Sequence, residues 1–238
     1  MPSNSFDRPL VLITRPQPEA DDLAERLRSK GIGVAMAPLF TIKPARLGPL
    51  PQANALLLTS PRAARYLPAG VQDMPTYALG EATAEAAKRA GLNVVAQGAG
   101  SSDTLPLHHL PQDTAVLHLS GDAIARDLAP VFQSLAIPYH RVVTYMAESA
   151  EELPATAGSF LLDGGPKIVT LFSVRAAQVF AQLVAAAGLD DRLTSVTAAC
   201  FGPRIARAAR QSLPYRSVRE SEAGNVTGFV DFVSSGAS

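Results

Sequence analysis

Small hydroxyl side chains, glycines and arginines recur in this chain where a strand-like apolar run passes into a helical pattern. In open parallel sheets, ligands bind at the carboxyl ends of the strands, where helix N-termini present free N–H groups. Residues of these types suit the binding of a large anion with several carboxylates. The candidate ligand-binding residues are Thr14, Arg15, Ser60, Arg62, Gly80, Thr83, Ser120, Ser173, Arg175, Gly202, Arg204 and Thr227, with Thr59, Gly121 and Asn225 beside them.

Each of these residues, taken alone, has a simpler explanation. A serine or threonine at such a junction is most often a helix N-cap, and an arginine is most often a solvated surface charge. Their recurrence in both halves of the chain is what favours a shared site for a ligand. No pair of carboxylates at helical spacing beside a strand end indicates an acid–base role.

The signatures of common cofactor sites and nucleophiles are incomplete. The run "GAGSSD" (residues 98–103) lacks the third glycine of the dinucleotide fingerprint. The run "DGGPK" (residues 163–167) has neither the spacing nor the hydroxyl residue of a P-loop. No G-x-S-x-G elbow occurs. We therefore expect no cofactor.

Charge and composition argue against several other classes of protein. Lys+Arg and Asp+Glu both number 21, so there is no basic excess for binding nucleic acid. No stretch approaches the roughly 18 apolar residues of a membrane span, and the polar residues 1–9 lack the apolar core of a secretory signal. Cys200 lies in an apolar run and is interpreted as a small buried hydrophobe, and the four histidines show no metal-ligand spacing. These features indicate a cytoplasmic, metal-free protein.

The elements that must position the candidate residues alternate along the chain. Apolar runs typical of buried strands are each followed by an amphipathic helical pattern, which predicts an α/β fold of parallel sheets with helices on both faces. The predicted strands are Leu10–Ile13, Ala55–Leu58, Thr76–Leu79, Ala115–Leu119, Ile168–Phe172 and Val196–Phe201.

The chain contains an internal repeat. Val11–Ile42 aligns without a gap with Val116–Ala147, at an offset of 105 residues. "LTSPRAARYL" (residues 58–67) resembles "LFSVRAAQVF" (171–180), and "ALGEATAEAAKRAG" (78–91) resembles "CFGPRIARAARQSL" (200–213). Three segments therefore occur twice in the same order, which predicts two similar lobes.

Two long extended runs, "PLFTIKP" and "RVVTYMAE", continue past the length of an ordinary strand and are interpreted as crossovers between the lobes. A simple division would give lobes of residues 10–114 and 115–238. The crossovers instead favour an exchange of segments, with residues 1–40 and 147–238 in one lobe and residues 43–144 in the other. The crossovers, residues 38–46 and 141–148, are expected to pair as a two-stranded hinge.

The order of the motifs resembles the uroporphyrinogen-III synthase family over nearly the whole chain. The resemblance is carried by "VLITRPQPEADDLAERLRSKG", "LLLTSPRAA", "YALGEATAEAAKRAG", "VVTYMAE", "IVTLFSVRAAQVF" and "AACFGPRIARAAR". It implies two α/β lobes joined by a ribbon hinge, with the substrate in the cleft between them. It also implies a cofactor-free reaction in which hydroxymethylbilane loses water, inverts its terminal pyrrole ring and closes to uroporphyrinogen III.

The resemblance also implies roles for individual residues. The hydroxyls of the family's cleft fall on Ser60, Thr83 and Ser173, the arginine of its opening "TRP" falls on Arg15, and its cleft tyrosine falls on Tyr145. Tyr145 would assist departure of the substrate hydroxyl, or would pack the hinge. The chain departs from the family pattern where Arg204 and Ile205 replace two threonines and where Ser120 replaces an arginine, so side-chain contacts there are in question.

Other readings remain open at this stage. A two-lobed small-molecule binding module, a nucleotide- or sugar-handling α/β enzyme, and a non-catalytic member of the same family would share much of this pattern. For the enzyme, we expect a monomer that binds a linear tetrapyrrole, contacts the preceding deaminase transiently, and binds neither nucleic acid nor membrane.

Overall fold

A computed structural model describes residues 10–124 and 126–236 of the chain. The chain divides into two compact units. The first unit joins the N-terminal segment up to Thr41 with the segment from Glu148 onwards, and the second unit is Ile42–Ala147.

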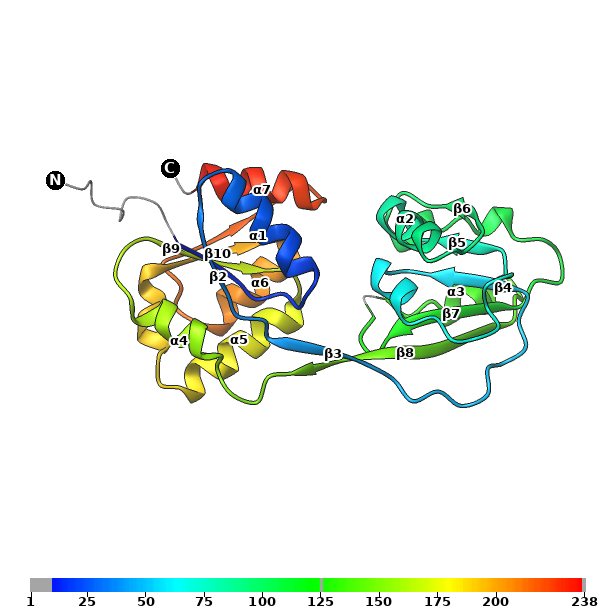
Figure 1. The fold of residues 1–238 in the computed structure, drawn as a ribbon, viewed down its shortest axis with the longest axis horizontal. Helices are drawn as coiled ribbons and strands as arrows, with labels where there is room; N and C mark the ends of the chain where they lie inside the picture. Colours follow the sequence, from blue (N-terminus) through cyan, green and yellow to red (C-terminus); the bar gives the residue numbers. More distant parts are fainter. Residues whose placement is uncertain (1–9, 125, 237–238) are drawn as a thin grey trace. The chain divides into compact units, whose positions relative to one another are not determined.

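The first unit is built on a five-stranded parallel sheet with the order β11-β10-β9-β1-β2. Its strands are β1 (Leu10–Ile13), β2 (Gly33–Met36), β9 (Lys167–Leu171), β10 (Val196–Cys200) and β11 (Ser217–Glu220). Helices cover both faces (Figure 1). They are α1 (Glu19–Ser29) and α7 (Val226–Ser235) on one face, and α4 (Ala155–Leu162), α5 (Val174–Ala186) and α6 (Pro203–Ser212) on the other.

The three central strands of this sheet are buried on both faces, which explains why their sequences are continuous apolar runs. Side chains at alternate positions of a strand point to opposite faces. Val11 and Ile13 therefore pack together with α1 and α7, in a cluster that includes the fully buried Phe229. Two threonine hydroxyls strengthen the centre of the sheet, because Thr170 donates to the carbonyl of Leu12 at 3.1 Å and Thr14 donates to that of Thr170 at 2.7 Å.

The second unit contains a six-stranded sheet with the order β3-β8-β7-β4-β5-β6. Its strands are β3 (Phe40–Pro44), β4 (Ala55–Leu58), β5 (Thr76–Ala78), β6 (Val94–Gln97), β7 (Val116–Gly121) and β8 (Tyr139–Ser149). One face packs with α2 (Glu81–Arg89) and the 3-10 helix η1 (Pro61–Arg65), and the other packs with α3 (Ala129–Ser134). Further 3-10 helices are η2 (Ser102–Thr104) and η3 (Leu107–His109) in this unit and η4 (Asp190–Ser195) in the first.

Strands β3 and β8 both run across the boundary between the two units. They are neighbours in the sheet, and backbone hydrogen bonds also involve residues just beyond their ends: the N–H of Ala150 donates to the carbonyl of Leu39 at 2.8 Å, and that of Ala45 to the carbonyl of Thr144 at 3.0 Å. Residue numbers rise on one strand as they fall on the other, so the pair is antiparallel.

The two copies of the repeat differ in this extended segment. In the first copy β2 and β3 are separate, and Pro38, which has no N–H, stands between them. The equivalent residue at the 105-residue offset is Val143, and the second copy is a single strand of 11 residues, β8. Pro38 therefore stands where the extended segment of the first copy is divided into two strands.

The expectation of an α/β fold with mostly parallel sheets flanked by helices is confirmed. The expected helix after β4 is wrong, because this segment forms only the five-residue η1. η1 ends at Arg65, and Pro68 follows three residues later; a proline disfavours helical geometry in the residue before it, here Leu67. No helix within the two described ranges is long and apolar enough to cross a lipid bilayer.

Candidate functional site

In each sheet the carboxyl ends of the parallel strands lie together along one side. In the first unit we call this side the first edge; it comprises residues 14–15, 172–175, 201–204 and 221–227. In the second unit we call it the second edge; it comprises residues 59–62, 79–83, 120–122 and 145. Thr14 is fully buried, and its hydroxyl bonds within the sheet. The guanidinium carbon of Arg15 lies 4.2 Å from the centroid of the Phe172 ring. Ser173 is exposed and begins α5, where its Oγ accepts a hydrogen bond from the Ala176 N–H at 3.0 Å.

The remaining candidates of the first edge lie at the starts of its other helices. The guanidinium carbon of Arg175 lies 5.0 Å from the centroid of the Phe40 ring. Gly202 begins α6, and Arg204 is exposed in the first turn of that helix. Thr227 is exposed in the first turn of α7 and accepts a hydrogen bond from Arg26 at 3.2 Å. The first edge therefore collects three helix N-termini and three arginines.

The second edge is built from the equivalent junctions. Ser60 begins η1, and its Oγ accepts from the N–H of Arg62 at 3.2 Å. Gly80 begins α2, and Thr83 is buried in the first turn of that helix. Ser120 is buried at the end of β7 and accepts a hydrogen bond from Nε of Arg141 at 2.9 Å. Ser120 thus holds an arginine, although the family pattern has an arginine at its own position.

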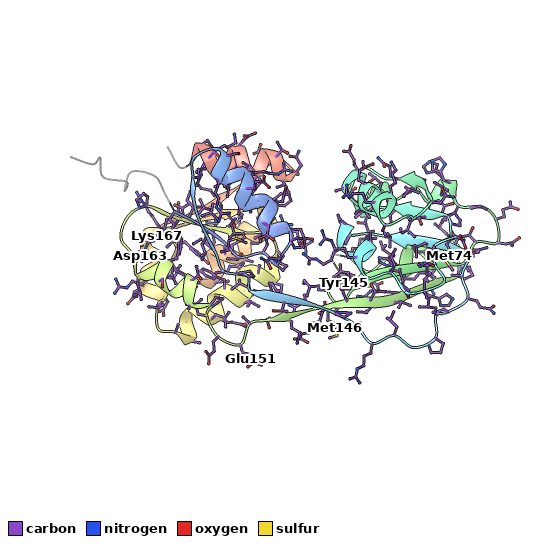
Figure 2. The ribbon with its side chains drawn as sticks, viewed as in Figure 1. Met74, Tyr145, Met146, Glu151, Asp163 and Lys167 are labelled. Atoms are coloured by element: carbon purple, nitrogen blue, oxygen red, sulfur yellow. The ribbon has the colours of Figure 1, made fainter. Side chains whose placement is uncertain are left out.

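Tyr145 lies against the carboxyl end of β7. A Cβ atom built at Gly121 would stand 2.6 Å from Cε2 and 3.1 Å from Oη of Tyr145, so the phenol covers this glycine. Tyr145 is 7% exposed, and its ring lies 5.3 Å from the ring of Tyr66, centroid to centroid. Figure 2 shows Tyr145 and Met146 on opposite sides of β8, as expected for successive strand residues. The structure therefore brings Tyr145 to the second edge and surrounds most of its ring with other groups.

A buried hydrogen-bonded network near this edge was not predicted from the sequence. The hydroxyl of Thr59 lies 2.8 Å from Nε2 of His118, and Nδ1 of His118 lies 2.6 Å from Oη of Tyr139. The Tyr139 ring stacks on Phe132 with centroids 4.6 Å apart. Burial, and secondarily the charge of Arg141, lower the pKa of His118 to about 4. The imidazole is therefore neutral near pH 7, and one ring nitrogen donates while the other accepts.

The repeat shows that this network belongs to the second unit alone. The residues of the network, and the strand-end residues beside it, have counterparts of a different type in the first unit. Apart from Arg15, the counterparts in the first unit are all apolar. The pairs, first unit then second, are Ile13 and His118, Val34 and Tyr139, Met36 and Arg141, Arg15 and Ser120, Phe172 and Thr59, and Phe201 and Leu79. A histidine aligned with an isoleucine inside an apolar run was the sequence signal for the network.

Metal-binding and thiol chemistry find little support among the described residues. Within residues 10–124 and 126–236, no group of three or more His, Cys, Asp and Glu side chains is placed to hold a metal ion. Cys200 is fully buried in β10, and burial raises the pKa of its thiol to about 12.

Comparison with known proteins identifies the family. The family model described as uroporphyrinogen-III synthase HemD matches residues 21–230, which is most of the chain. The chain belongs to the uroporphyrinogen-III synthase family. Members of this family are cyclising enzymes of tetrapyrrole biosynthesis, and this chain is one of them. The resemblance noted in the sequence is thereby confirmed.

Solved structures of uroporphyrinogen-III synthases share the fold. The uroporphyrinogen-III synthetase from Helicobacter pylori is 18% identical and has a TM-score of 0.67, with 96% of this chain and 99% of that chain covered. A mutant synthase from the extremely thermophilic bacterium Thermus thermophilus is 17% identical with a TM-score of 0.51, covering 94% of this chain and 97% of that chain. At these identities the likeness shows the fold. No curated protein matches in sequence.

The glycines that begin α2 and α6 give a matched pair of variants. A Cβ at Gly80 would stand 2.7 Å from Cα of Gly100, whereas a Cβ at Gly202 has no atom within 4 Å. Both substitutions replace glycine by alanine at a helix N-cap, so their difference isolates the steric clash. We expect Gly80→Ala to cost about 1–3 kcal/mol in urea unfolding and Gly202→Ala less than about 1 kcal/mol. Equal losses would show that the close approach of Gly100 is unimportant.

The low pKa of His118 predicts a pH-dependent stability. The unfolded chain binds a proton on this residue below about pH 6.5, whereas the native chain does not until about pH 4, so stability falls as pH falls through this window. The expected loss is about 2 kcal/mol between about pH 7.5 and pH 5 in urea unfolding. His118→Gln should lack this loss, and His140→Gln, an exposed histidine on β8, should retain it. Identical pH dependence in all three proteins would contradict the buried neutral imidazole.

Proposed function

We propose that this chain converts hydroxymethylbilane into uroporphyrinogen III, with loss of water, inversion of the terminal ring and closure of the macrocycle. The observation that carries the proposal is the family match across residues 21–230. It is supported by the gathering of hydroxyl, glycine and arginine residues at the carboxyl edges of both sheets. A binding module or a non-catalytic relative, by contrast, would not convert hydroxymethylbilane at all.

The main task of the protein in this reaction is orientation. Departure of the substrate hydroxyl leaves a resonance-stabilised azafulvene cation, so this step needs little acid assistance. Holding a flexible chain with its ends in the geometry for inverted closure is harder, and orientation of this kind contributes up to roughly 7–11 kcal/mol. The residues that bind the substrate therefore determine which isomer forms.

Both edges contribute groups suited to a polycarboxylate. The helices α2, α5, α6 and α7 begin at these edges, and helix N-termini suit anions because their first N–H groups have no carbonyl partner within the helix. In α5 and α7 one such N–H, of Ala176 and of Gly228, is already bonded to the side chain of Ser173 or Asn225. The guanidinium groups of Arg15 and Arg175 each lie over an aromatic ring within cation–π distance, which favours one position of the side chain before a carboxylate arrives. Ser60, Thr83 and Ser173 are further candidates for contact with the substrate, although Ser60 and Ser173 also cap helices.

Tyr145 is the candidate catalytic residue. Its phenol covers Gly121 at the second edge, so the hydroxyl lies beside the ends of strands rather than deep in the sheet. The equivalent residue in the first copy is Phe40, which fills its place without a hydroxyl. A polar task therefore accounts for the phenol better than packing does, and donation to the departing hydroxyl of the substrate is such a task.

The setting of the enzyme follows from the same properties. We place it in the cytoplasm, because its one cysteine is a buried free thiol and not part of a disulfide. We further propose that it acts as a monomer. The unstable linear substrate favours transient contact with the preceding deaminase. The crossovers β3 and β8 are proposed to act as the hinge that accommodates the substrate.

The test is the isomer formed from hydroxymethylbilane by the wild-type chain, Tyr145→Phe and Tyr66→Phe. The wild type should give the type III isomer instead of the type I isomer of uncatalysed closure. Tyr145→Phe should lower kcat by about tenfold or more with little change in KM, since a fully realised general acid is worth about 10²–10⁴-fold. Activity should stay above background, with type III as the product.

Tyr66→Phe is the matched control, because it removes a hydroxyl from the ring that contacts Tyr145. It should retain wild-type kcat. If Tyr145→Phe also retains wild-type kcat, Tyr145 is a packing residue. Formation of only the type I isomer with the wild-type chain would refute the proposed function.

A further inference from the structure

Two phenylalanines lie side by side at the first edge. Phe172 follows β9 and Phe201 follows β10, and the N–H of Phe201 donates to the carbonyl of Leu171 at 3.0 Å. Their rings stack with centroids 5.1 Å apart and an interplanar angle of 26°. Both side chains are partly exposed, whereas Phe229 of α7, which packs edge-on to Phe172 at 4.7 Å, is fully buried. The exposed pair therefore rests on a fixed apolar base.

Arg15 completes this cluster from the neighbouring strand. Strands β1 and β9 pair in parallel with Ile13 opposite Thr170, and Arg15 and Phe172 each lie two residues further along. The guanidinium carbon of Arg15 lies 4.2 Å from the Phe172 centroid, which is within cation–π distance. Arg15, Phe172 and Phe201 thus follow three adjacent strands on the same face of the sheet, and we call them the aromatic platform.

Packing of the fold does not require these residue types. The second unit has the same junctions, and it carries Thr59 and Leu79 where the platform has Phe172 and Phe201. Ser120 takes the place of Arg15. The second unit uses Thr59 and Ser120 for hydrogen bonds with His118 and Arg141 instead. The two edges are therefore chemically different, although their backbones repeat.

We propose that the aromatic platform is a subsite for one carboxylate-bearing pyrrole ring of the tetrapyrrole. The electron-rich planar ring packs against the partly exposed phenylalanines, since aromatic rings prefer offset or edge-on contact with one another. The guanidinium of Arg15, oriented by Phe172, binds the carboxylate of that ring through paired N–H···O bonds. The subsite distinguishes the first unit from the second and so fixes the direction in which the linear substrate binds. This inference rests on the proposed function.

The probes that separate stacking from charge are a monopyrrole with two carboxylate side chains and its dimethyl ester. Their dissociation constants are measured by NMR titration of the full chain. The variants carry the residues of the second unit: Phe172→Thr, Phe201→Leu and Arg15→Ser. A second substitution, Phe172→Leu, keeps apolar packing in case Phe172→Thr fails to fold.

The expected pattern has two parts. The phenylalanine variants raise the dissociation constants of the diacid and of the diester alike, each by up to about tenfold, because stacking does not depend on charge. Arg15→Ser raises the dissociation constant of the diacid alone, so that the diacid no longer binds more tightly than the diester. With the tetrapyrrole substrate, all these variants raise KM more than they lower kcat.

The matched control is Phe232→Leu. Phe232 also lies under an arginine, with the guanidinium carbon of Arg219 at 4.7 Å from its ring centroid, but it belongs to α7 and not to a strand end. Phe232→Leu should leave both dissociation constants unchanged. Wild-type binding of both probes by folded platform variants, or an equal loss in Phe232→Leu, would overturn the subsite.

The outcomes also separate this inference from the proposed function. If the wild-type chain shows no turnover but the probes show the expected pattern, the proposed function fails, and the aromatic platform stands only as a binding site for a carboxylate-bearing pyrrole. If turnover gives the type III isomer but the probes do not distinguish the variants, the subsite fails and the proposed function stands.

Discussion

The pairing of β1 with β9 is the interaction on which the rest of the structure depends. It joins residues far apart in the sequence, as in the hydrogen bond between Thr14 and Thr170, which are 156 residues apart. Because β1 completes a sheet with strands from the C-terminal part of the chain, the chain must leave the first unit after one segment and later return. Both connections are extended strands, β3 and β8, and both cross the boundary between the units.

The same parallel pairing explains how one repeated backbone serves two kinds of chemistry. Parallel strands end together, so the junction residues of each unit converge on one edge whatever their types. In the first unit the junctions carry Arg15, Phe172 and Phe201, which suit a ring and its carboxylate. In the second they carry Tyr145 and Thr59, and the hydroxyl of Thr59 is bonded to the buried His118. Under the proposed function, this difference between the two edges matches a substrate whose two ends are distinct.

The central strands were predicted well from the sequence, because a strand buried on both faces is a continuous apolar run, as in Leu10–Ile13 and Ala55–Leu58. The edge strands β2, β6 and β11 were missed, because they are short and partly exposed, and Ser217–Glu220 is largely polar. At the site, the junction residues could be named, but not their partners. That the hydroxyl of Thr14 is bound to a backbone carbonyl, or that His118 joins Thr59 to Tyr139, depends on contacts between separate segments.

We propose that the carboxyl edges of both sheets contact the tetrapyrrole. Hydrogen–deuterium exchange of the full chain, with and without uroporphyrin III as the oxidised form of the cyclic product, tests it directly. We expect slower exchange on binding in residues 173–176 and 202–206 of the first edge and in residues 80–84 of the second. The opposite end of the first sheet, residues 164–167, should show no change. Protection confined to one unit, or protection of residues 164–167 in place of the edges, would contradict this claim.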